Sequence, residues 1–198
     1  MDKNVENYIN RTKTALTSGS IIAFFFVFML CIIVGGAFSL HLGEFILLGL
    51  LAAGVTAILG FYFTSIKCEW GMSFYMGVTM IEISIASFTV SYVCLNILTG
   101  LGPWLLIFYL PVFVCGCAGF ILFVWKKIKN DAYSKKPEKT NVVSAYIGAG
   151  LTVAFCPVIF SNPRLAVTFL AVVFLFTGII FTAGSSCFFK AFLQKKYL

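Results

Sequence analysis

Glu82 is the residue whose type and position are best suited to chemistry, because it is a single acid inside a long apolar stretch. An acid at the centre of a membrane-spanning helix costs about 2.5 to 3.5 kcal/mol on insertion scales, so it should face the interior of a helix bundle. At helical spacing it shares one face with Tyr75, Thr79 and Thr89, which are polar where a lipid-facing row would be apolar. These four residues predict a polar site within the membrane.

Two interpretations of Glu82 are open at the level of the sequence. In the first, the carboxyl group is a coupling site for pH-dependent or ion-dependent transport. In the second, it is a structural acid that bonds a neighbouring hydroxyl or carbonyl group. A Glu82→Gln change should abolish transport in the first case and cost little in the second, since the amide resembles the protonated acid in size.

Other reactive side chains form no recognisable catalytic or metal-binding set. The single histidine, His41, lies in a predicted turn beside Glu44, and histidine-based haem or zinc sites need further ligands. Cys115 and Cys117 are two positions apart, which on a helix points them about 200° apart. Only Cys68 of the seven cysteines falls outside a predicted span. The sequence therefore predicts no catalytic residue, no metal, no cofactor, no disulfide and no enzyme.

The composition predicts that hydrocarbon, not water, surrounds most of the chain. Of its 198 residues, 61% are hydrophobic and only 11% are charged, whereas about a quarter are charged in soluble domains. A segment that crosses hydrocarbon must pair every backbone group internally, so it is a helix or part of a closed barrel. Long unbroken apolar runs favour helices. We therefore expect an all-α, polytopic integral membrane protein.

Six apolar runs are long enough to cross a bilayer as helices. Their approximate bounds are 21–40, 45–64, 71–95, 104–125, 142–160 and 165–189. These spans form one transmembrane domain, 19–189, between a cytoplasmic segment, 1–18, and a cytoplasmic tail, 190–198. Within the first segment, apolar residues at helical spacing suggest an amphipathic helix on the membrane surface, with a frayed polar terminus as the alternative.

The positive charges predict the orientation of this six-helix bundle. With six spans, 13 of the 14 lysines and arginines fall on one side of the membrane, and Arg164 alone falls on the other. Cationic residues favour the cytoplasm, so both termini and the basic loop 126–141 should be cytoplasmic. We therefore interpret the net charge of +7 as a topology signal and not as evidence of nucleic-acid binding. The basic loop should contact anionic lipid headgroups.

Rows of small residues within the spans predict close helix packing, because burial of apolar area gives little driving force in lipid. The rows are Gly49, Ala53, Ala57 and Gly60; Cys115, Gly116 and Gly119; Ser144, Gly148 and Thr152; and Gly178, Thr182 and Ser185. Such faces could also bind other membrane proteins or a second copy of the chain. Pro111 and Pro157 lie within spans and should bend them.

The last four residues include Lys195 and Lys196. Two lysines at these positions resemble the dilysine retrieval signal of eukaryotic endoplasmic-reticulum membrane proteins, which is an address read by a receptor. The alternative is an ordinary lysine-rich cytoplasmic tail. The expected location is the endoplasmic-reticulum membrane in a eukaryote and the plasma membrane otherwise.

Taken together, these patterns favour a non-enzymatic multi-pass membrane protein that acts as a transporter, a channel or a membrane subunit of a transport complex, with its polar site at Glu82. The alternative is an assembly, sorting or scaffold protein whose helices bind other membrane proteins.

Overall fold

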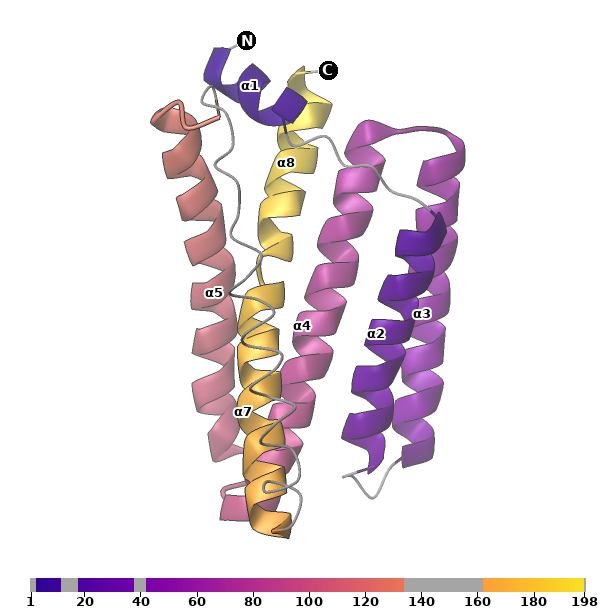
Figure 1. Ribbon diagram of the computed structural model, residues 1–198, viewed down its shortest axis with the longest axis vertical. Coiled ribbons are helices and arrows are strands. Elements are labelled where there is room, and N and C mark those ends of the chain that lie inside the picture. The colour runs from indigo at the N-terminus through magenta and orange to yellow at the C-terminus, as the bar shows by residue number, and fades with distance from the viewer. Residues whose placement is uncertain (1–2, 12–17, 38–41, 134–161, 198) are drawn as a thin grey trace.

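The computed structural model describes residues 3–11, 18–37, 42–133 and 162–197, and these residues are mostly helical, with no strand among them. In chain order the helices are α1 (Lys3–Arg11), α2 (Ser18–Ala37), α3 (Leu42–Ser65), α4 (Glu69–Thr99), α5 (Trp104–Lys129), α7 (Pro163–Phe181) and α8 (Gly184–Tyr197) (Figure 1). The predicted span 142–160, most of the basic loop and His41 lie outside the described residues.

Three helical stretches are long and apolar enough to cross a membrane. They are Glu69–Thr99, Trp104–Lys129 and Pro163–Tyr197, the last of which contains both α7 and α8. Two shorter apolar helices, Gly19–Leu30 and Gly49–Ser65, belong to α2 and α3. The described chain is thus all-helical and compatible with an integral membrane protein.

Local sequence signals explain where two of the long helices begin and end. At the end of α4, Gly100 adopts a left-handed conformation with φ of 66°, and its N–H donates to the Asn96 carbonyl. The Asn96 side chain in turn accepts from the N–H of Gly102 at 2.8 Å. At the start of α7, Asn162 accepts from the N–H of Arg164 at 3.0 Å, and Pro163 occupies the first helical position.

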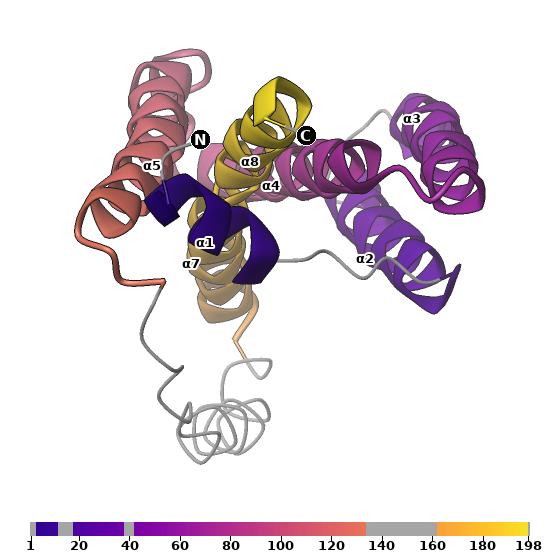
Figure 2. The same cartoon turned by 90° about the horizontal axis from the view of Figure 1, so that it is seen from above.

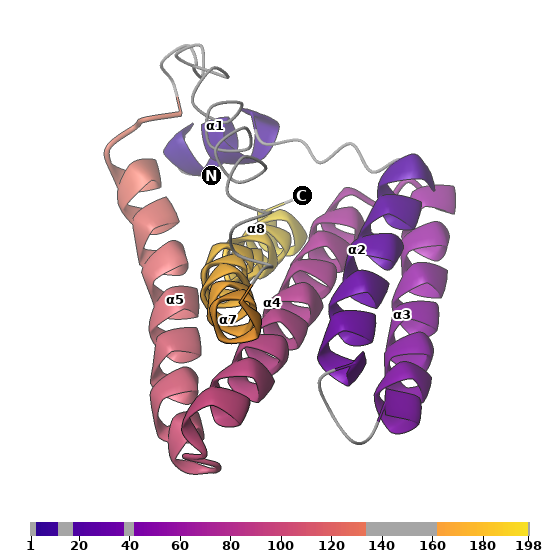
Figure 3. The same cartoon turned by 60° about the horizontal axis from the view of Figure 1, so that its bottom comes forward.

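Helix α4 is the centre of the arrangement. It packs along α7 and α8 on one side and against the α2–α3 pair on the other, while α5 packs mainly along α8 (Figures 2 and 3). Hydroxyl groups of α4 bond the backbone of α7: Ser84 donates to the Gly178 carbonyl at 2.7 Å, and Ser91 donates to the Ala171 carbonyl at 2.6 Å. Small residues and such hydrogen bonds hold helices together where lipid replaces water.

The predicted last span, 165–189, is broken in the structure. Helix α7 ends at Phe181 and α8 begins at Gly184. At the break the Thr182 hydroxyl donates to the Ile179 carbonyl at 2.6 Å, and the Ser185 hydroxyl donates to the Thr182 carbonyl at 2.8 Å. Hydroxyls that bond preceding carbonyls compete with the regular helical pattern and bend helices.

The described parts of both terminal segments are helical and pack against the rest of the protein. Helix α8 continues to Tyr197, and its residues Leu193 and Gln194 are buried. The apolar face of α1, formed by Val5, Tyr8 and Ile9, packs against Leu193 and against Ile128 of α5. The face expected to lie on the membrane is therefore covered by protein, and α1 lies across the ends of the bundle (Figure 2).

Most of the described cationic residues gather at one end of the molecule. Helix α1, the connection between α3 and α4, the C-terminal end of α5 and the C-terminal end of α8 all lie there (Figure 1). We call this the lysine end, and its lysines include Lys67, Lys126, Lys127, Lys129, Lys195 and Lys196. Arg164 lies at the start of α7, at the opposite end. Lys129 Nζ lies 5.4 Å from the ring centre of Trp125, and Lys195 Nζ lies 5.4 Å from that of Trp70.

Candidate intramembrane site around Glu82

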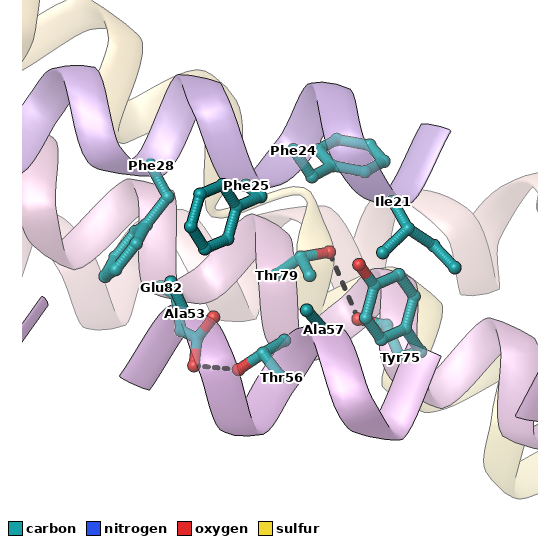
Figure 4. Close-up of a pocket in the computed structure, with 10 residues that line it drawn as sticks. All are labelled: Ile21, Phe24, Phe25, Phe28, Ala53, Thr56, Ala57, Tyr75, Thr79 and Glu82. Carbon is teal, nitrogen blue, oxygen red and sulfur yellow. Dashed lines mark hydrogen bonds between the residues drawn. The ribbon is translucent and has the colours of Figure 1, made fainter. Parts of the chain in front are cut away.

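Helices α2, α3 and α4 meet around the carboxyl group of Glu82 (Figure 4). Glu82 and Thr79 come from α4, Thr56 comes from α3, and α2 supplies three phenylalanine rings. The side chains that line the cavity are Ile21, Phe24, Phe25, Phe28, Ala53, Thr56, Ala57, Tyr75, Thr79 and Glu82. The site is therefore a small polar group enclosed by aromatic and aliphatic walls.

Thr56 is the hydrogen-bond partner of Glu82. Its hydroxyl Oγ1 lies 2.6 Å from Glu82 Oε1 and 3.0 Å from the carbonyl oxygen of Ala52. One hydroxyl carries one proton, so it donates either to the carboxylate or to the Ala52 carbonyl. In the second arrangement the Thr56 oxygen can accept a hydrogen bond from a protonated Glu82. The same heavy-atom positions thus suit both protonation states of the acid.

The other two polar side chains of the cavity are held by their surroundings. Thr79 Oγ1 lies 3.1 Å from each of the Tyr75 and Met76 carbonyl oxygens, so its proton bonds the backbone of its own helix. The Tyr75 ring is buried against Gly60 of α3, where an added Cβ would lie 2.6 Å from the ring. No lysine, arginine or histidine is among the residues that line the cavity.

The size of the cavity limits what it can hold. Its volume is about 10 Å³, which is about the minimum for one water molecule. Protein interiors are close-packed, so a larger guest would have to displace the phenylalanine rings of α2. An organic solute does not fit this arrangement, whereas a water molecule or a proton does.

Three of the four sequence-predicted site residues come together, and the fourth does not. Tyr75, Thr79 and Glu82 line the cavity, but Thr89 lines a separate open groove of about 500 Å³ between α4 and α5. The Thr89 hydroxyl donates to the Ile85 carbonyl of its own helix at 2.9 Å. The α2–α3 pair covers Glu82, whereas α5 flanks the part of α4 that carries Thr89.

Thr56 is the site residue that the sequence did not identify. It lies beside the small residues Ala53 and Ala57 in the middle of the second predicted span. A polar residue next to a small-residue row was the available signal, because such rows mark where neighbouring helices approach. Nothing in the sequence indicates that this row faces Glu82.

The remaining candidate groups lie away from this cavity. Among the described residues the cysteines Cys68, Cys94, Cys115, Cys117 and Cys187 are free, and no group of three histidine, cysteine or acidic residues could hold a metal. Lys195 and Lys196 lie in the last turn of α8 at the lysine end. Among the described residues, Glu82 and the cavity around it are thus the functional candidate that these observations support.

Comparisons with protein-family models, with curated proteins and with solved structures found no match to this chain.

Proposed function

We propose that this protein is a non-enzymatic multi-pass membrane protein that acts in transport, as a transporter, a channel or a membrane subunit of a transport complex. The observation that carries the proposal is the placement of Glu82. Its carboxyl group lies half-buried inside an apolar enclosure, with the Thr56 hydroxyl as its hydrogen-bond partner and no cation among the lining residues. Ionisable groups at that depth are costly, and they mark ion or proton pathways in membrane proteins.

The proposed topology has six crossings, with both termini in the cytoplasm. Its support is the gathering of the lysine-bearing helix ends at one end of the molecule, with Arg164 at the other (Figure 1). Lysine ammonium groups that lie over the rings of Trp70 and Trp125 are typical of a membrane interface, where aromatic rings and cationic groups meet the headgroups. We propose anionic lipid headgroups as the contacts of this end.

Cys68 provides a test of this orientation. It lies in the turn before α4 at the lysine end and is half-buried, whereas Cys94 is buried and Cys115 is exposed on a predicted membrane-facing surface. The thiolate is the reactive form, and hydrocarbon disfavours it. We expect a membrane-impermeant maleimide to modify Cys68 first, and only from the cytoplasmic side. The measurement is mass analysis of the protein after labelling in sealed vesicles of each orientation, with Cys68→Ser as the control. Modification of Cys68 from the non-cytoplasmic side would overturn the orientation.

The functional test compares ion flux through the wild type and the Glu82→Gln variant in lipid vesicles. The purified protein is given outward and inward gradients of H⁺, Na⁺ and K⁺ in turn, and flux is followed with dyes trapped inside. We expect Glu82→Gln to lower flux at least about tenfold, which corresponds to about 1.4 kcal/mol of activation free energy. The matched control is Glu6→Gln, the same change at an exposed acid of α1. Equal flux through all three proteins would remove the basis of the transport proposal.

A second candidate function, assembly or scaffolding of other membrane proteins, is favoured by one face of α5. Cys115, Gly116 and Gly119 line an open groove of about 310 Å³, and a Cβ added at Gly119 would meet no atom within 4 Å. Small residues on an open helix face allow another helix to approach closely. Absence of flux together with cross-linking of a partner at Cys115 would favour this function over transport.

A further inference from the structure

We propose that the species bound at Glu82 is a proton, and not a metal cation or an organic solute. This proposal rests on the proposed function, since it names the species handled by the same site. The binding step is the addition of one proton to the carboxylate: an O–H bond forms, the negative charge is lost, and no other bond changes. Release is the reverse of this step.

The number of oxygen atoms in the cavity argues against a metal cation. The lining side chains carry at most five oxygens, which are two from Glu82 and one each from Thr56, Thr79 and Tyr75. The Thr79 hydroxyl is already within 3.1 Å of two backbone carbonyl oxygens. Hard cations such as Ca²⁺ and Mg²⁺ take about six or more oxygen ligands, and channels that strip a monovalent cation of its water replace that shell with carbonyl oxygens. The remaining walls are phenylalanine, isoleucine and alanine, whose side chains offer no ligand.

The hydrogen bonding around Glu82 fits a proton. Thr56 Oγ1 lies within hydrogen-bond distance of both Glu82 Oε1 and the Ala52 carbonyl oxygen. When Glu82 is ionised, Thr56 donates to it. When Glu82 is protonated, Thr56 turns its own proton to Ala52 and accepts from the acid. A rotation of one hydroxyl hydrogen therefore accommodates both states. The surrounding side chains need not move, although the cavity has a volume of only about 10 Å³.

Among the described residues that line the cavity, no cationic side chain competes with the proton for the Glu82 carboxylate. The cavity walls supplied by α2 and α3 contain no titratable side chain, since they consist of Ile21, three phenylalanines, two alanines and Thr56. From α4, Tyr75 is the only other titratable residue of the lining. No cationic side chain of the lining takes the place of the proton as the partner of the carboxylate.

The test is an infrared titration of the full chain in lipid vesicles, which needs no transport. A protonated carboxylic acid has a C=O stretching band that disappears on ionisation. The chain has seven acidic residues, so the Glu82 band is the one found in the difference between the wild-type and Glu82→Gln spectra. We expect this band to titrate between about pH 4 and pH 10, a window that brackets both ordinary and strongly displaced carboxyl groups. The band should be absent from Glu82→Gln and present at a displaced frequency in Glu82→Asp. In Thr56→Val its frequency should also change, because the acid loses its hydrogen-bond partner.

Salt replacement then distinguishes a proton from a metal cation. A cation that competed for the carboxylate would lower the midpoint by about one pH unit for each tenfold rise in its concentration above its dissociation constant. We expect the same midpoint in NaCl, KCl, MgCl₂ and CaCl₂ as in an organic-cation chloride of equal ionic strength. A midpoint that follows the concentration of one metal ion, or a Glu82 band that never titrates, would overturn the proposal.

The two proposals fail separately. A titrating Glu82 whose glutamine variant conducts normally would end the transport proposal and leave the proton site intact. Loss of flux in Glu82→Gln together with a titration midpoint set by Na⁺ would support the transport proposal and refute the proposal that Glu82 binds a proton.

Discussion

Replacement of Gly184 by leucine is expected to separate α4 from α8 and to destabilise the fold by about 1 to 3 kcal/mol or more, as overpacking of a close contact does. A Cβ at this position would lie 2.9 Å from the carbonyl oxygen of Gly77, 2.7 Å from Met80 Cβ and 3.2 Å from the backbone nitrogen of Ile81. Two of these three atoms belong to the backbone of α4, so they cannot rotate away. Even alanine should therefore lower the thermal midpoint.

Gly119→Leu is the matched control for this change. Gly119 lies on α5, where an added Cβ would meet nothing within 4 Å, so leucine should leave the midpoint unchanged or slightly raised. The measurement is thermal unfolding of both variants in the same lipid–detergent micelles, followed by the protein retained as a monodisperse peak. If Gly119→Leu lowered the midpoint as far as Gly184→Leu does, the close approach of α4 and α8 would not be the cause.

The small-residue rows show what the sequence could and could not predict about packing. Gly49 approaches Ile32, Gly116 approaches Thr182, and Gly178 approaches Phe88, each so closely that an added Cβ would lie between 2.7 and 3.1 Å from the neighbour. Gly119 belongs to the same kind of row and meets nothing. The pattern thus indicates where a backbone can be approached, but the choice of neighbour depends on the tertiary arrangement.

The serines of α4 were not predicted as packing residues, although several of them are buried in the structure. Ser84, Ser87 and Ser91 are all 0% exposed, and Ser91 also lies 2.6 Å from the Tyr109 hydroxyl of α5. In a sequence, a serine lowers the mean hydropathy of a predicted span, so the pattern does not indicate that it stabilises the helix bundle. Inside a bundle, its hydroxyl bonds the carbonyl of another helix and allows a closer approach than a larger side chain would.

Helix existence was predictable from apolar length, whereas the break and the end of the last span were not. Hydropathy reports how long a segment can remain in hydrocarbon. It does not report that the hydroxyls of Thr182 and Ser185 bond preceding carbonyls and interrupt the helix. Nor does it report that Leu193 packs against α1, or that α8 continues to Tyr197 through most of the predicted cytoplasmic tail, 190–198.

The candidate site illustrates the same limit on a single helix. Glu82 and Thr89 are seven positions apart and lie on one face of α4, and the sequence grouped them for that reason. Two residues seven apart are separated by about 10.5 Å along the axis, which is enough for different helices to cover them. The α2–α3 pair covers Glu82, and α5 flanks Thr89. A shared face predicts a shared environment only where one neighbour covers its whole length.

Thr56→Val and Thr89→Val make a matched pair that tests this division. Both replace a hydroxyl by a methyl group of similar size. Thr56 is buried, and its loss leaves Glu82 Oε1 without its hydrogen-bond partner, which should cost about 1 to 3 kcal/mol. Thr89 bonds only the Ile85 carbonyl of its own helix beside an open groove, so its replacement should change stability by less than about 0.5 kcal/mol.

The assignment of the Thr56 effect to Glu82 follows from a double-mutant cycle. In a Glu82→Leu background no carboxyl group is left to satisfy, so Thr56→Val should cost little, and the two changes should be non-additive by about 0.5 kcal/mol or more. Thr89→Val should add independently to Glu82→Leu, because the two residues share no partner. Unfolding free energies of the variants in micelles provide the comparison. Equal coupling of Thr56 and Thr89 to Glu82 would show that one continuous site runs along α4, as the sequence alone suggests.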